Sequence, residues 1–430
     1  MKLKTISLFL AATFLTGACV FAQSAADPKE RVRLVRDLSK KSEDGIADLA
    51  TYVRDPATEV RLEVVKQLNQ IGGPRTIPSL IPLSADTDPE IQIHAVDGLI
   101  NVFLPGYLKN GVARSITRSN DQLRVKFVDN TQVVDGYIIV PPEVVGAVTN
   151  VLTTSKSLES RANAARALGI FRAQAAVAPL GQALYSKDDQ LMFESLIALQ
   201  KIRDASAGPS VAFLVRDLNE KIQIAALRTA GILRAKPAAA NIRSVIDDGP
   251  NKRVLREAAS TLAMIADPPD RGIFLGFLTN SDMELRASAA EGLARIRNPT
   301  DLARLEKAFN DEREFGPRLA FAFALVSLGR LEVNETSPFR YLVNAFDRNT
   351  FRAIALAYFT ELARDPAVRQ TLYPTLARAT SDEKTGLCVV LGESGDRDSV
   401  RYLTALKDDT DVAVSQVCLS SLRTLQARLQ

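Results

Sequence analysis

Arg286-Ala-Ser-Ala-Ala-Glu-Gly-Leu-Ala-Arg-Ile296 decides the fold, because this stretch belongs to a pattern that returns along the chain. After an opening arginine, small and apolar residues recur at helical spacing. Clear copies occupy Arg61–Ile71, Arg161–Phe171 and Arg256–Ile265, and further copies begin at Arg318 and Arg352. Degenerate copies begin near Arg31, Ile93, Phe193, Ile224, Thr385 and Ser415. Most steps between starts are 30 to 34 residues, a period that indicates helical repeats.

A second, looser helix follows each copy, as in Ile77–Ile81, Ala178–Leu184 and Leu302–Phe309. Turn residues separate the repeats, and in many of these turns an acidic or amide residue precedes a proline. Examples are Asp88-Pro89 and Asn298-Pro299. Asp or Asn before Pro favours a helix start, with a capping side chain and proline at the first helical position. One helical pair cannot bury its apolar faces alone, so we expect the pairs to stack into a continuous core.

The pattern resembles HEAT repeats over nearly all of residues 27–430. The resemblance rests on the Asp-Pro turn, on Val60-Arg61 and Leu285-Arg286 opening the first helix, and on Ile77-Pro78 opening the second. It implies an all-α fold: a right-handed α-solenoid superhelix of about eleven to twelve helical hairpins. It also implies that the recurring arginines pair with acids of adjacent turns. The family serves many unrelated scaffolds, and its enzymatic relatives are HEAT-like lyases that attach bilins to proteins.

The first 22 residues have the features of a signal peptide. Lys2 and Lys4 precede an apolar core at 6–15, and Val20-Phe21-Ala22 is a small-x-small cleavage site. The sequence therefore predicts a signal peptide at 1–22, a solenoid at 23–430, and a periplasmic or secreted protein. Lipid anchoring at Cys19 is the less favoured alternative. Cleavage would leave 52 basic residues of the 54 against 50 acidic ones, and this near-neutral balance argues against nucleic acid.

One interruption, at about 104–142, breaks the period, since the step from Ile93 to Arg161 is 68 residues. Leu123, Val125 and Phe127 alternate with basic residues, and 133–140 is rich in β-branched side chains. We expect a non-helical insertion, either a β-hairpin or an extended loop. Insertions in solenoids often bind partners. The candidate partner-binding residues are Tyr107, Lys109, Arg114, Arg118, Arg124, Lys126 and Tyr137. A surface loop or a plug in the first turn of the superhelix is the competing interpretation.

The residue types that common catalytic sites require are scarce in this sequence. The chain has one histidine, His94, and two cysteines beyond the signal region, so we predict no metal site, no cofactor and no catalytic residue. Cys388 and Cys418 lie 30 residues apart at matching places of the last two repeats. Buried free thiols are the default interpretation, and a disulfide that staples the C-terminal repeats is the alternative.

These observations predict a non-enzymatic scaffold of the cell envelope that binds a protein along its concave surface, aided by the insertion. Two alternatives stay open. One is a HEAT-like lyase or an accessory subunit of an enzyme complex. The other is a structural envelope protein anchored by a lipid.

Overall fold

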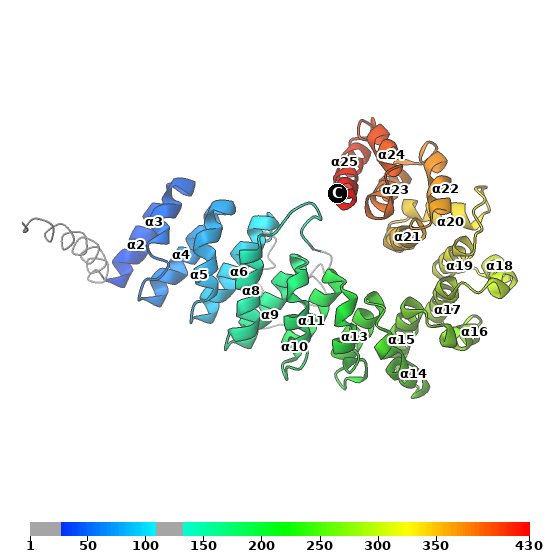
Figure 1. Cartoon of the computed structure of the whole chain (residues 1–430), viewed down its shortest axis with the longest axis horizontal. Coiled ribbons are helices and arrows are strands. Elements are labelled where there is room, and N and C mark those ends of the chain that lie inside the picture. The colour runs from blue at the N-terminus through cyan, green and yellow to red at the C-terminus, as the bar shows by residue number, and fades with distance from the viewer. Residues whose placement is uncertain (1–26, 109–131) are drawn as a thin grey trace, which may run out of the picture. The chain divides into compact units, whose positions relative to one another are not determined.

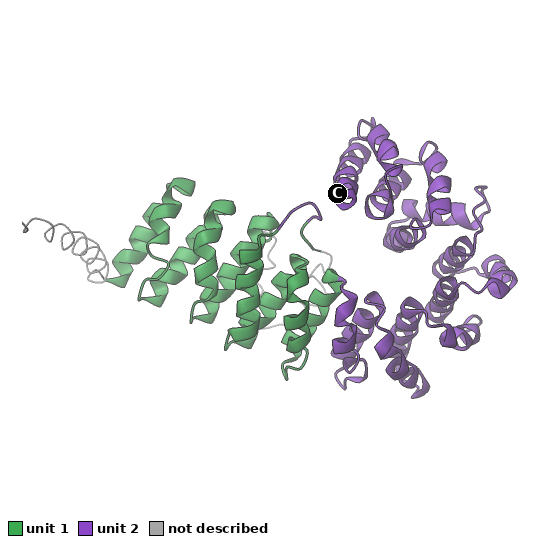
Figure 2. Ribbon diagram, in the orientation of Figure 1, with its two compact units in different colours: residues 1–134, 140–202 green, residues 135–139, 203–430 purple. Residues whose placement is uncertain are grey.

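The computed structural model describes residues 27–108 and 132–430, and every regular element in these two ranges is a helix. The chain divides into two compact units: residues 1–134 with 140–202, and residues 135–139 with 203–430 (Figure 2). The helices of unit 1 are α2 (Pro28–Ser39), α3 (Ile46–Ala50), α4 (Thr58–Ile71), α5 (Ile77–Ser84), α6 (Pro89–Phe103), α8 (Pro142–Thr154), α9 (Leu158–Ile170), α10 (Val177–Ala183) and α11 (Asp189–Ile202).

The helices of unit 2 are shorter in alternate positions, as Figure 1 shows. They are α12 (Gly208–Val211), α13 (Glu220–Ile232), α14 (Ala239–Asp247), α15 (Lys252–Ile265), α16 (Arg271–Phe277), α17 (Met283–Ile296), α18 (Leu302–Asp311), α19 (Phe315–Ser327), α20 (Pro338–Asn344), α21 (Asn349–Leu362), α22 (Pro366–Leu376), α23 (Ser381–Ser394), α24 (Ser399–Leu406) and α25 (Val412–Leu429). In chain order the described helices make eleven two-helix repeats and a final helix, α25. The predicted all-α repeat fold is confirmed.

The first helices of successive repeats form one layer within each unit. In unit 1, α4 packs on α6, α6 on α9 and α9 on α11, while the second helices α5, α8 and α10 form the other layer. Small residues permit the close approach. A side chain at Gly169 of α9 would place its Cβ 2.6 Å from the Cα of Ala198 on α11. Because the interior of a protein is close-packed, glycine is required at this contact.

The interruption lies inside a repeat. The 68-residue step contains one repeat and the expected insertion, because α6 stacks directly on α9, and α8 packs between α5 and α10 in the layer of second helices. The segment therefore separates the two helices of the third repeat and replaces no repeat. Its described part, 132–141, is irregular with a turn and forms neither helix nor strand. The alternating residues 123–127 of the expected hairpin lie outside the described residues.

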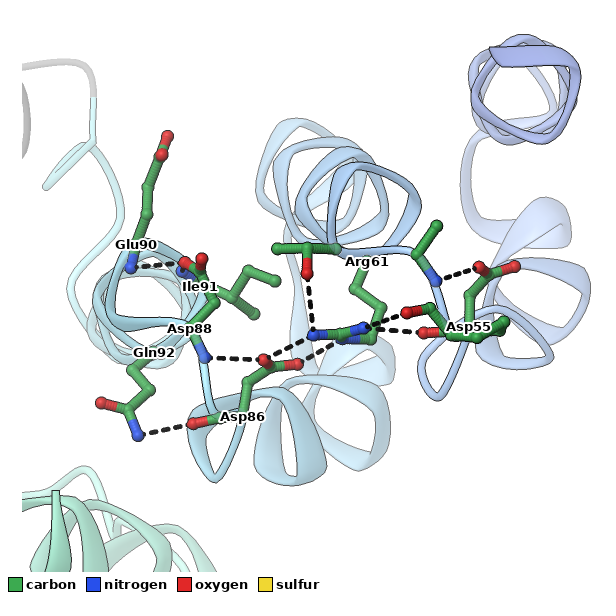
Figure 3. Close-up of polar contacts among 10 residues, drawn as sticks. Asp55, Arg61, Asp86, Asp88, Glu90, Ile91 and Gln92 are labelled. Atoms are coloured by element: carbon green, nitrogen blue, oxygen red, sulfur yellow. Dashed lines mark hydrogen bonds and ion pairs between the residues drawn. The ribbon is translucent and has the colours of Figure 1, made fainter. Parts of the chain in front are cut away.

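A ladder of arginines joins the turns of neighbouring repeats (Figure 3). Arg61 of α4 donates to Asp86 of the next turn (Nε–Oδ2 2.6 Å) and to the Asp55 carbonyl of its own turn (2.8 Å). The Asp86 carboxylate also accepts from the backbone N–H of Asp88 (2.9 Å), and Asp88 caps α6. Burial alone would raise the pKa of Asp86, but these hydrogen bonds outweigh it and lower the pKa.

The same pair recurs along the chain. Other members are Arg31 with Asp55 (2.8 Å), Arg256 with Asp282 (2.9 Å), Arg286 with Glu312 (2.7 Å) and Arg352 with Asp382 (2.7 Å). Arg161 instead donates to the Leu152 carbonyl (2.8 Å). The structural role expected for the recurring arginine is therefore confirmed. Arg318 departs from the ladder, since its guanidinium lies over the rings of Phe309 (4.8 Å) and Tyr341 (5.0 Å).

The two C-terminal cysteines are joined by a disulfide. The Cα atoms of Cys388 on α23 and Cys418 on α25 lie 5.2 Å apart, and both side chains are buried. Ordinary helix spacing would make this separation marginal. Gly392, one turn beyond Cys388, removes that obstacle, because its missing side chain lets the Ser421 side chain lie against the α23 backbone. The structure thus contains the disulfide that we gave as the alternative, and the default interpretation of free thiols is wrong.

The ladder predicts that Arg61→Ala destabilises the protein. It removes a half-buried ion pair and leaves the Asp86 carboxylate and the Asp55 carbonyl short of a donor, so we expect a loss of about 1–3 kcal/mol. Denaturant unfolding followed by circular dichroism measures it. Arg36→Ala is the matched control, because Arg36 also pairs across repeats, with Glu63, but is 59% exposed. Equal losses in the two variants would contradict a special role for the ladder.

The disulfide predicts that the unreduced chain has a mass lower than its reduced form by two hydrogen atoms. Reduction, or Cys388→Ser with Cys418→Ser, removes a covalent link between α23 and α25 that is worth about 3.6 kcal/mol for a separation of 30 residues. Limited proteolysis should then cut α25 first. Alkylation of both cysteines without prior reduction would disprove the bridge.

Candidate binding face

The first helices of unit 2 form its inner face. In Figure 1, α13, α15, α17 and α19 line the inner side of a curved stack, and α14, α16 and α18 lie on the outer side. The stacking follows from the contacts of α13 with α15, α15 with α17 and α17 with α19. Polar side chains that point away from the second helices therefore gather on one curved surface, which we call the inner face.

A polar network crosses this face and is centred on Arg295 of α17. The Arg295 guanidinium is 3.0 Å from Glu361 of α21 and 3.3 Å from Glu291, one helical turn back on α17. It also donates to the Ala263 carbonyl of α15 (3.2 Å). Arg234, just beyond α13, pairs with the same Glu361 carboxylate (3.0 Å) although 127 positions separate the two residues. The network thus ties α13, α15, α17 and α21 together.

An aromatic pair supports the network from α19 and α21. The rings of Phe323 and Tyr358 stack with centroids 4.4 Å apart, and the Arg295 guanidinium lies 5.2 Å from the Phe323 ring. The Tyr358 hydroxyl donates a short hydrogen bond to Glu291. Tyr358 and Glu361 stand three residues apart on α21, and Glu291 and Arg295 four apart on α17, so each pair shares a helix face.

Electrostatics fix the protonation states in this network. Burial raises the pKa of Tyr358 well above its usual value, and the adjacent Glu291 carboxylate adds to the effect, so the phenol stays protonated and donates. Burial would lower the pKa of Arg295, but Glu291 and Glu361 outweigh it and raise the pKa. Arg234, Glu291, Arg295, Tyr358 and Glu361 thus bind one another, and their contacts restrain the curvature of the inner face.

Unit 1 holds a comparable buried cluster on its first helices. Arg166 of α9 binds Glu194 of α11 (Nη2–Oε1 2.6 Å), and Asn163 bridges Arg166 to Asp97 of α6 (3.1 Å to the Asp97 oxygen). Tyr107, which we predicted to bind a partner, lies beside this cluster and is only 1% exposed. Burial raises the pKa of its phenol. This position belongs to the core, so Tyr107 is not a surface contact.

The other predicted binding residues fall in two groups. Tyr137 is 39% exposed, and its hydroxyl donates to Asp135 (2.9 Å). Lys109, Arg114, Arg118, Arg124 and Lys126 lie outside the described residues. Sequence reasoning missed the network on the inner face, although the Glu291-Arg295 spacing was a signal. The partners Arg234 and Glu361 are too far apart in sequence for any local pattern to join them.

His94 lies on α6 with its side chain 33% exposed, and its Nε2 is 3.6 Å from Glu90. Burial and the nearby Lys66 lower its pKa. Within residues 27–108 and 132–430, no group of three His, Cys, Asp or Glu side chains is arranged to hold a metal ion. In the same ranges, no helix is long and apolar enough to cross a membrane.

Comparison with known proteins identifies the repeat. The family model for HEAT repeats matches residues 18–100, and the model for the PBS lyase HEAT-like repeat matches residues 160–186. No curated protein matches the chain.

The solved structures that resemble it include the following three. The complex of CpcE and CpcF of phycocyanin lyase from Nostoc sp. PCC7120 is 18% identical, with a TM-score of 0.36, over 62% of this chain and 92% of that one. The YibA protein of Escherichia coli is 14% identical, with a TM-score of 0.40, over 69% and 96%. An engineered protein is 17% identical, with a TM-score of 0.31, over 92% and 99%.

The network predicts that Arg295→Met destabilises unit 2. The change leaves Glu291 and Glu361 short of their common cation on a largely buried surface, so we expect a loss of roughly 2–4 kcal/mol. Hydrogen exchange should show the loosening in α17 and α21. Arg228→Met is the control, because Arg228 also joins two inner helices, through Glu257, but is 53% exposed. Unchanged hydrogen exchange of α17 and α21 in Arg295→Met would show that the network does not stabilise unit 2.

Proposed function

This chain is a HEAT-repeat protein, and we propose that it is a non-enzymatic scaffold of the cell envelope or periplasm that binds a partner protein along its inner face. The observation that carries the proposal is the network centred on Arg295, which holds four inner helices in one fixed curvature. A preformed curved surface binds through many shallow contacts and needs little reordering. HEAT repeats commonly mediate protein interactions.

The N-terminal segment supports the envelope as the location. Its basic start, short apolar core and cleavage site are typical of an export signal, and Cys19 provides the lipid-anchored alternative. The insertion at 104–142 is the second element of the proposed binding surface. Its exposed residue Tyr137 marks the described part that a partner would reach.

A lyase-like subunit is the second candidate. The match of residues 160–186 to the PBS lyase HEAT-like repeat favours it. Tyr358 on the inner face does not act as a base at neutral pH, because burial raises the pKa of its phenol and its hydroxyl donates to Glu291. A covalent change in a co-purified partner, made by the purified chain, would favour the lyase.

Site-specific photo-crosslinking tests the scaffold. A benzoylphenylalanine at position 228 on the inner helix α13, or at Tyr137, should crosslink a partner in the native envelope. The same group at the exposed Arg304, on the outer helix α18, should not. Crosslinks from position 304 alone would move the binding surface to the outer face and contradict the proposal. Mass spectrometry of the mature N-terminus separates a chain that begins at Gln23 from one lipidated at Cys19.

A further inference from the structure

The arginine ladder is interrupted in unit 2, at Arg318 of α19. Arg318 occupies the ladder register, because it stands four residues after the cap position of its helix, as Arg286 does on α17. The Nε of Arg286 donates to Glu312 (2.7 Å). The Nε of Arg318 is buried and has no acceptor. Arg318 is therefore a ladder arginine without its acid.

A core residue takes the place of the missing acid. The ladder acids Asp86 and Glu312 each stand two residues before the cap position of the following first helix. The matching position before α21 holds Phe346, whose side chain is fully buried. Its ring fills the space at Gly386 of α23, where an added Cβ would lie 2.2 Å from it. The turn that would supply a carboxylate to Arg318 thus supplies packing instead.

Aromatic rings hold the Arg318 guanidinium in place. Its central carbon lies 4.8 Å from the Phe309 ring and 5.0 Å from the Tyr341 ring. Stacking uses the faces of a guanidinium and leaves the N–H donors along its edge. The Nη nitrogens of Arg318 are not buried, and among the described residues they have no acceptor. Such an edge binds a carboxylate through two parallel hydrogen bonds.

A second arginine, Arg348, adds positive charge to the same group of rings. Arg348 is exposed at the start of α21, and its guanidinium lies 4.3 Å from the Phe315 ring. Phe315 in turn stacks on Tyr341, with centroids 5.0 Å apart. Burial raises the pKa of Tyr341, and the charges of Arg318 and Arg348 oppose this rise. We call these two arginines with the rings of Phe315 and Tyr341 the ladder break.

Local charge selects the kind of ligand. In the part of the chain that the structure describes, neither arginine of the ladder break pairs with an acidic side chain. Neighbouring acids are engaged elsewhere, since Glu312 binds Arg286 and Asp347 accepts from the Thr380 hydroxyl (2.6 Å). The ladder break therefore attracts an anion. These flanking acids disfavour a dense polyanion, and the ladder register takes a carboxylate in other repeats.

We propose that the ladder break binds an acidic side chain of the partner protein, which supplies the carboxylate that Arg318 lacks. The inference rests on the proposed scaffold function and adds the chemistry of the partner and its place, at the edge of the inner face where α19 begins. The partner's carboxylate binds the Nη edge of Arg318, and the charge of Arg348 strengthens the attraction. Apolar residues beside the acid pack on the half-buried rings of Phe315 and Tyr341.

The test uses the full chain and two fluorescent peptides, one with a single glutamate between two leucines and one with glutamine in its place. Fluorescence anisotropy should show about tenfold tighter binding of the glutamate peptide. Arg318→Met should remove most of this preference, and Arg348→Met should reduce it about threefold. Arg304→Met is the control and should leave the preference unchanged. Arg304 is also exposed without an acidic partner among the described residues, but lies outside the ladder break.

Melting temperatures separate binding from a structural role. Arg318→Met should change the melting temperature little, because Arg318 has no carboxylate to lose and its buried Nε has no acceptor. Arg286→Met is the same change one repeat earlier, and it should lower the melting temperature because Glu312 loses its cation.

Three results would overturn the inference. They are equal binding of the two peptides by the native chain, an undiminished glutamate preference in Arg318→Met, and a fall in the melting temperature of Arg318→Met equal to that of Arg286→Met. Crosslinking from position 228 separates this failure from failure of the scaffold proposal. Crosslinks that persist alongside any of these results leave the scaffold standing without an acidic contact at the ladder break.

Discussion

The close approach of neighbouring first helices is the contact on which the rest of the structure depends. Gly169 against Ala198 and Gly392 against Ser421 bring adjacent backbones nearer than larger residues would allow. This approach puts the carboxylate of one turn within reach of the arginine of the previous repeat, and it places Cys388 and Cys418 within bonding distance. A two-helix repeat has no core of its own, so each unit owes its stability to these interfaces.

Charged side chains serve two different ends of the same helices. At the start of the first helices the ladder arginines are buried or half-buried and paired, as Arg61 is with Asp86. At the far end Arg234 and Arg297 have a left-handed backbone, and Arg297 is exposed. The first arrangement stabilises the stack, because a buried guanidinium must be paired. The second costs stability, because glycine adopts this conformation without strain.

The insertion shows how a solenoid tolerates added chain. The inserted segment connects α6 and α8, the two helices of one repeat, and each of these helices still packs in its layer. Closing a longer connection between two helices costs little entropy. Its flanks are nonetheless anchored: Tyr107 is buried beside Arg166, and the Val134 N–H donates to the Ile170 carbonyl of α9 (2.9 Å).

The sequence by itself determined the repeat, its helical content and the pairing of its ladder, because these depend on contacts one repeat apart. Arg61 and Asp86 are predictable partners, since the same arrangement returns in other repeats, as in Arg256 with Asp282. Tertiary structure alone decided that Tyr107 is buried, that the insertion splits a repeat, and that Arg295 joins Glu361 and Arg234 across the inner face. These depend on curvature and on side chains as far as 127 residues apart, and a period in the sequence does not encode either.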